Sequence, residues 1–91
     1  MKIIYVLSII LDDCRSYAFS TYEKAIDKFL NILYQEIEKA PDRDNLKHTI
    51  TLIEEKMDMN YSDYVKSLPI DLFNEYFGDD VAFVNKAQFI E

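Results

Sequence analysis

The stretch KIIYVLSIILDDCRSYAFSTYEKAIDKF, residues 2–29, decides the fold that we predict for this chain. Its apolar run over residues 3–11 is rich in β-branched side chains and is followed by the polar pair Asp12 and Asp13, which is typical of a strand and a turn. Residues 15–19 then alternate between apolar and small or polar side chains. The pattern predicts a β-hairpin. The near-continuous apolarity of 3–11 favours a central strand that is enclosed on both faces, or partly so.

The same opening shares features with a secretion signal. Lys2 precedes the apolar run, and Leu11 and Cys14 have the spacing of a lipoprotein box. Asp12 and Asp13, however, leave no small-residue cleavage site. The apolar run is about nine residues long, against the ~20 that a membrane-spanning helix needs. We therefore expect a cytoplasmic protein with no membrane partner, and a single cysteine excludes an internal disulfide.

A helix is predicted over residues 21–40. Ser20 and Glu23 have the spacing of a capping box, in which each side chain bonds the backbone amide of the other residue. Pro41 ends the helix, because the residue before a proline avoids helical geometry. Between these signals the apolar residues recur at helical spacing and form a stripe of Tyr22, Ile26, Phe29, Leu33 and Ile37.

Residues 19–25, with the sequence FSTYEKA, carry a resemblance to known domains. Together with the opening hairpin and a closing strand at 81–90, they resemble small phage-borne and bacterial β-β-α…β domains whose helix starts with F-S-[ST]-x-E-K-A. The resemblance covers half of the chain and implies the outline of the fold and an origin in a mobile element. It implies no catalytic residue. The middle of this chain departs from that pattern because it is longer and more helical.

The second half of the chain predicts three further helices, at 44–57, 61–68 and 69–77, and a last strand at 81–90. This last strand is expected to pair with the most apolar strand, which should be the most enclosed. The sum is a single α+β domain over residues 1–91, in which a small, mostly antiparallel sheet packs against helices. Its strands are residues 3–11, 15–19 and 81–90.

The ends of these helices have candidate caps. Asp44 suits the start of the first, Asn60 or Ser62 the start of the second, and Pro69 the first turn of the third, which Gly78 ends.

One segment has two interpretations. Residues 46–53 contain enough β-branched side chains to form a strand. A helix is favoured, because the apolar stripe continues through Met57.

Catalytic and metal sites are expected to be absent. His48 and Cys14 are the only histidine and cysteine, and nothing in their spacing joins them as base and nucleophile. Residues 58–62 begin like a calcium loop, but Asp63 takes its glycine position and Pro69 its glutamate position. With one glycine the chain has no phosphate-binding loop. We therefore expect no enzyme activity, no cofactor and no metal.

The charge is uneven along the chain. The net charge is −7, and residues 42–91 hold eleven acids against five bases, which gives −6 for that half. Such a surface repels nucleic-acid phosphates and anionic membranes and attracts basic proteins. We expect a basic protein partner and no direct contact with nucleic acid.

Acids and tyrosines interleave in the second half of the chain. Tyrosine supplies a large contact area at low entropic cost, and carboxylates pair with arginine and lysine. The predicted partner-binding residues are Asp58, Tyr61, Asp63, Tyr64, Asp71, Glu75, Tyr76, Asp79 and Asp80. A second interpretation is that the tyrosines close the core together with Phe73 and Phe77.

Two functions follow from these patterns. The first is a small acidic inhibitor that occludes a basic, nucleic-acid-handling host protein or complex, as nucleic-acid mimics, many anti-CRISPR proteins and toxin-immunity proteins do. The second is an assembly module that self-associates or docks through a sheet edge or an apolar helix side, with charge serving solubility. We expect the first.

Overall fold

The computed structural model of the protein describes residues 2–10 and 14–89, and it contains one antiparallel sheet. The strands are β1 (Lys2–Ile9), β2 (Arg15–Phe19) and β3 (Ala82–Phe89), in the order β2-β1-β3. Leu7 faces Tyr17 of β2 on one side and Val84 of β3 on the other. The three strands and the pairing of the first with the last are confirmed. The predicted end of the first strand at Leu11, the turn at Asp12 and Asp13 and the end of the last strand at Ile90 lie outside the described residues.

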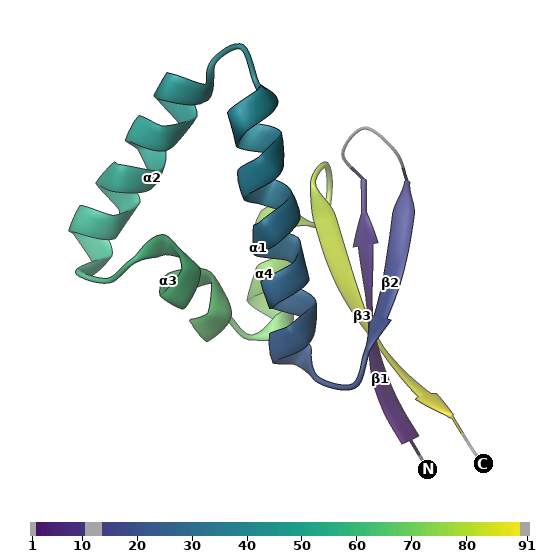
Figure 1. Ribbon diagram of the computed structural model, residues 1–91. Coiled ribbons are helices and arrows are strands. Elements are labelled where there is room, and N and C mark those ends of the chain that lie inside the picture. The colour runs from purple at the N-terminus through teal and green to yellow at the C-terminus, as the bar shows by residue number, and fades with distance from the viewer. Residues whose placement is uncertain (1, 11–13, 90–91) are drawn as a thin grey trace.

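Four helices connect the hairpin to the last strand (Figure 1). They are α1 (Tyr22–Lys39), α2 (Arg43–Met57), α3 (Tyr61–Ser67) and α4 (Ile70–Phe77). All four were predicted to within one residue at each end, and residues 46–53 are helical. The α+β class is therefore confirmed. Along the described chain, no helix combines the length and the apolarity that crossing a membrane would require.

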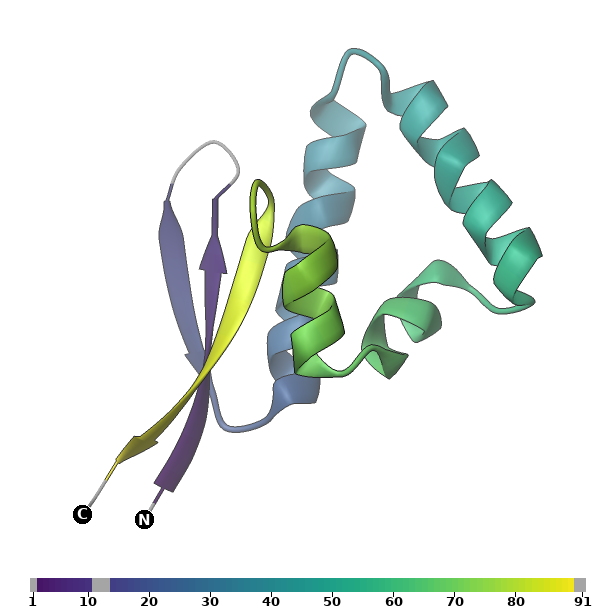
Figure 2. The same ribbon diagram turned by 180° about the vertical axis from the view of Figure 1, so that it is seen from behind.

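The helices cover one face of the sheet (Figures 1 and 2). Leu7 and Val84 are an adjacent pair and are 0% and 1% exposed, whereas the alternate residues Val6 and Phe83 are only half-buried. Of the two alternatives predicted for β1, enclosure on both faces is therefore wrong and partial enclosure is confirmed, because the helices cover one face only. The apolar residues at alternate positions of β1 and β3 lie on the uncovered face, a pattern that antiparallel sheets allow.

The cap of α1 lies one residue later than predicted. Thr21 has extended backbone angles, with φ −136° and ψ 153°, and its Oγ1 accepts a hydrogen bond from the Lys24 backbone N–H at 3.2 Å. Glu23 is then the second helical residue, so the predicted capping box with Ser20 is wrong. Ser20 Oγ instead accepts from Lys24 Nζ at 3.4 Å. Serine and threonine both cap helices well, and the sequence pattern did not separate two neighbouring candidates.

The other caps follow the sequence more closely. Asn60 caps α3, where its Oδ1 accepts from the Asp63 backbone N–H at 2.9 Å. Gly78 follows the last residue of α4, as predicted, and has right-handed backbone angles. Asp44 is not the cap of α2. It lies in the first turn, where its charge favours the helix dipole, and Asp42 occupies the cap position without a side-chain hydrogen bond.

Aromatic side chains join the helices into one core. The ring of Phe29 on α1 meets Phe73 edge-on, with centroids 4.9 Å apart and an interplanar angle of 86°, and lies 5.0 Å from the Phe77 ring. The Tyr22 hydroxyl donates to the Leu68 carbonyl at 3.0 Å. These contacts hold α4 beside α1 on the same face of the sheet, which fixes the face of α4 that is exposed (Figures 1 and 2).

Candidate partner-binding surface

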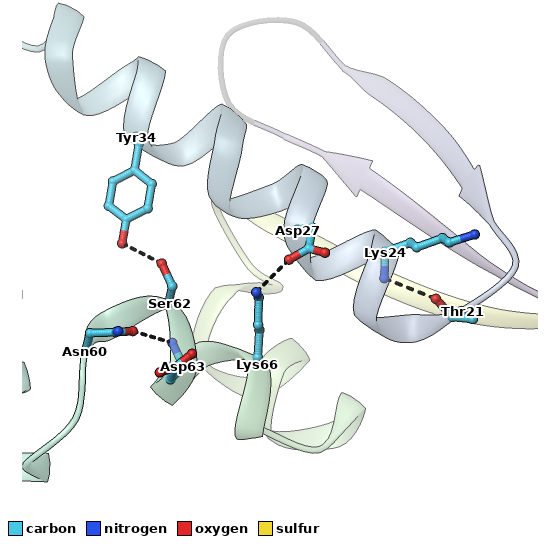
Figure 3. A network of polar contacts seen from close by, with 8 residues as sticks. All are labelled: Thr21, Lys24, Asp27, Tyr34, Asn60, Ser62, Asp63 and Lys66. Carbon is cyan, nitrogen blue, oxygen red and sulfur yellow. Dashed lines mark hydrogen bonds and ion pairs between the residues drawn. The ribbon is translucent and has the colours of Figure 1, made fainter.

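Polar contacts fix α3 against α1 (Figure 3). The Lys66 Nζ lies 2.9 Å from Asp27 Oδ1, and the Tyr34 hydroxyl lies 3.1 Å from Ser62 Oγ. The hydrogen bond and charge of Asp27 raise the pKa of Lys66. Both residues of the ion pair are well exposed, so the pair orients α3 more than it stabilises the fold.

The predicted tyrosines of α3 face inward. Tyr61 is 8% exposed, and burial is the main cause that raises its pKa to about 12. Its backbone N–H donates to Glu54 Oε2 at 2.8 Å, which ties the start of α3 to α2. Tyr64 is half-buried and packs beside Tyr61, with ring centroids 6.4 Å apart. The second interpretation, in which tyrosines close the core, therefore agrees with where Tyr61 and Tyr64 lie.

Asn74 positions α4 against the sheet. Its Nδ2 donates to the Val84 carbonyl at 2.9 Å, and its Oδ1 accepts from the Val84 N–H at 2.8 Å. The N–H and the carbonyl of Val84 point away from β1, on the outer edge of β3, because a residue in a strand directs both of its backbone groups to the same side. The sequence analysis missed Asn74. The available signal was weak: asparagine is a poor helix former in the middle of a short helix.

The outer face of α4 carries the charge. Asp71, Glu75, Asp79 and Asp80 are all exposed, and we call these four residues the acidic strip. Residues 67–85, which contain the strip, hold these four acids and no lysine or arginine. Of the ion pairs among described residues, none involves the strip. Tyr76 is exposed beside it, with 60% of its surface accessible. Asp71 and Glu75 share a face of α4 because they are one turn apart, and Tyr76, Asp79 and Asp80 are exposed close to them in the chain, so five of the nine predicted residues are exposed within residues 71–80.

Asp58 and Asp63 lie apart from this strip. Asp58 follows α2 in the left-handed conformation, with φ 55°, and ends that helix. Asp63 is exposed in the first turn of α3, where its backbone N–H bonds the cap. Both carboxylates therefore belong to helix ends on the far side of α3 from the strip, where α2 meets α3 (Figure 1).

An apolar groove lies between α2 and the other helices. It has two adjoining parts of about 410 and 360 Å³, which share Ile53, Tyr61 and Phe77 in their lining. We call this surface the apolar groove. Its first part runs along Leu33, Ile37, Leu46, Ile50 and Val81, and its second part along Met57, Tyr64 and Tyr76.

The groove exists because α2 contacts only the edge of the core, through Ile50 and Ile53. None of its residues is buried, and its apolar stripe of Leu46, Ile50 and Ile53 is only half-buried. Polar contacts hold its two ends, through Lys47 and Glu38 Oε1 at 2.6 Å and through Glu54. The pKa of Glu38 is lowered, first by its hydrogen bond with Lys47 and then by that residue's charge. The stripe was recognised in the sequence, but its exposure was not.

Other reactive groups are dispersed. Cys14 is exposed before β2, and His48 is exposed on α2, on opposite sides of α1 (Figures 1 and 2). Among the described residues, no group of three or more histidine, cysteine, aspartate or glutamate side chains is placed to hold a metal ion. The described surface thus combines a charged strip with an apolar groove, which share the neighbourhood of Tyr76.

Comparison of the chain with protein-family models, with curated proteins and with solved structures gave no match. The resemblance to β-β-α…β domains therefore stays a prediction.

Proposed function

We propose that this protein is a small inhibitor, which binds a basic, nucleic-acid-handling protein through the acidic strip and Tyr76. The observation that carries the proposal is the uncompensated charge of the strip: four exposed acids with no base within residues 67–85. A strip of this kind attracts a groove built to hold phosphates. Occupying that groove would exclude the nucleic acid.

The spacing of the charges supports mimicry of a nucleic-acid strand. Asp71 and Glu75 are one helical turn apart, which is about 6 Å along the axis. Asp79 and Asp80 follow in the turn after α4, and if the helical rise is carried through this turn the four charges spread over about 14 Å, or roughly one charge per 4 Å. A single strand of DNA carries one charge per ~3.4 Å of its axis. The strip therefore offers a basic groove a similar charge density over a short distance.

The packing of α4 against the sheet favours tight binding by the acidic strip. The buried Phe73 and the two Asn74 hydrogen bonds hold α4 from its inner side. Carboxylates on a helix that is already ordered lose less entropy on binding than carboxylates on a mobile segment. Long-range attraction between the strip and a basic groove also speeds association and makes it sensitive to salt.

The test compares two variants of equal net charge. The strip variant is Asp71→Asn, Glu75→Gln and Asp79→Asn, and the control neutralises three exposed acids elsewhere, at Glu23, Asp42 and Asp44. Each tagged protein is used to capture partners from a cell lysate, washed at low and high salt and challenged with added DNA or RNA. We expect the wild type and the control to retain a basic protein that nucleic acid displaces. Equal retention by the strip variant would refute the proposal.

A second candidate, an assembly module, rests on the uncovered sheet face. Val6 and Phe83 lie on it, half-buried, and β2 forms an open edge. Strands of eight residues, about 27 Å long, in a sheet about 14 Å wide cover about 400 Å². Two such faces bury about 800 Å², below the ~1,200 Å² of stable interfaces. A concentration-dependent mass in sedimentation, unaffected by salt, would favour this candidate over the first.

A further inference from the structure

We propose that the apolar groove receives an amphipathic helix of the basic partner, with its apolar side chains against α2 and its lysines or arginines toward the surrounding acids. This inference rests on the proposed function, because it names the part of the basic partner that the protein binds in addition to the contacts of the acidic strip. It also assigns a role to α2, which the strip does not use.

The first support is the uncovered state of α2. A 15-residue helix with no buried residue gains little from tertiary packing, and isolated helices of that length are marginal in water. Its Ile50 and Ile53 contact the edge of the core, but with Leu46 they are only half-buried and line the groove. An apolar occupant would complete the packing of α2 from its open side.

The second support is the shape of the groove. From Leu46 to Met57 the α2 stripe extends over eleven residues, which is about 16 Å, or three helical turns. Both parts of the groove follow this length, and they join at Ile53. A helix that lies in an apolar groove contacts it with side chains at i, i+4 and i+7, and a further contact at i+11 extends this row to about 16 Å. The groove therefore matches a helical segment of about three turns.

The third support is the charge around the groove. At its α1–α2 end, the charges cancel locally within two ion pairs, which are Lys39 with Glu36 and Lys47 with Glu38. The remaining charged residues that line the groove, or that neighbour its lining in the chain, comprise one base, Lys56, and several acids that form no ion pair within the described residues. These acids are Glu54, Glu55, Asp58, Asp63, Glu75 and Asp80. The surroundings therefore select a basic helix over an acidic one.

The probe for this inference is a synthetic, fluorescein-labelled helix of about 18 residues. It carries leucines at i, i+4, i+7 and i+11 and lysines elsewhere, and a matched peptide carries glutamates in place of the lysines. The variant is Ile50→Gln, which makes the groove polar. The control is Leu52→Gln on the same helix, where the side chain is 51% exposed and lines no part of the groove. Fluorescence anisotropy measures the Kd.

We expect the lysine peptide to bind the wild type and Leu52→Gln equally, and Ile50→Gln about tenfold or more weakly. The glutamate peptide should not bind. Equal affinity for all three proteins, or binding that high salt abolishes, would mean that charge alone holds the peptide and would overturn the inference. A wild-type dimer in sedimentation that the peptide does not dissociate would also overturn it, because a second copy would then cover the groove.

Two further measurements keep the outcomes separate. If Ile50→Gln does not fold, backbone NMR shifts of the wild type replace it. The peptide should then shift residues 46–57 and Val81, and shifts confined to the uncovered sheet face around Val6 would overturn the inference. The lysate assay with the strip variant tests the proposed function independently. A partner lost by that variant but retained by Ile50→Gln would leave the proposed function standing and remove this inference alone.

Discussion

Replacing Asn74 with alanine tests how α4 is held against the sheet. The change removes two hydrogen bonds, from Nδ2 to the Val84 carbonyl at 2.9 Å and from the Val84 N–H to Oδ1 at 2.8 Å. Each contributes about 1 kcal/mol, and the backbone groups of the buried Val84 lose their partners, which raises the total to about 2–3 kcal/mol. For a domain of this size, each 1 kcal/mol lowers Tm by about 4–8 °C, so we expect a fall of about 10–20 °C.

Circular dichroism during heating measures this fall, and hydrogen exchange of the Val84 amide reports on the site directly. Asn31→Ala is the control, because Asn31 is exposed on α1. It should leave Tm unchanged or raise it slightly, since alanine favours helices. In Asn74→Ala the Val84 amide should exchange faster. A fall in Tm of less than about 3 °C, with Val84 still protected, would refute the reasoning that Asn74 holds the edge of β3.

Two further predictions concern the helix cap and the buried tyrosines. Thr21→Ala should destabilise the protein by about 1 kcal/mol and Ser20→Ala by much less, as measured by urea unfolding, and the reverse order would place the cap at Ser20. Burial raises the pKa values of Tyr61 and Tyr22 to about 12, above the ordinary 10, so the folded state favours their neutral forms. Stability from these two residues should be complete below pH 10 and lost between about pH 10 and 12. Ultraviolet absorbance should show tyrosinate forming last at these two residues, and their ionisation together with the exposed tyrosines would contradict this prediction.

The elements of this fold were predictable because each has a local signal. Alternation gave β2, the apolar run gave β1, and the 3.6-residue period gave α1, all from short windows of sequence. The cap at Thr21 was not predictable, since Ser20 offers the same chemistry one residue earlier. The sequence also did not predict that the helices cover only one face of the sheet. An apolar strand face indicates burial without identifying what covers it, and here no helix of the described residues covers the face of Val6 and Phe83 (Figure 1).

The candidate site was predicted in part, for a reason that lies in the chemistry of tyrosine. Aspartate and glutamate on α4 had to face outward once Phe73 and Phe77 faced inward, so the acidic strip follows from periodicity. Tyrosine has an apolar ring and a polar hydroxyl, and it suits a core as well as an interface. The interleaved pattern therefore grouped the buried Tyr61 with the exposed Tyr76. Only the packing separates them.

The acidic strip and the apolar groove differ in their dependence on salt, so the two proposed sites would complement one another in one binding surface. Salt screens the attraction of the strip beyond a Debye length of about 8 Å at physiological ionic strength, whereas the transfer of apolar side chains from water into the groove is not screened. A surface with the strip alone would capture any basic protein quickly and release it as quickly. A groove alone would accept any apolar helix. Together, charge sets how often a basic partner arrives and the groove sets how long it stays, so strip variants should chiefly change the association rate and Ile50→Gln the dissociation rate. Kinetic measurements that show both variants acting on the same rate would contradict this division.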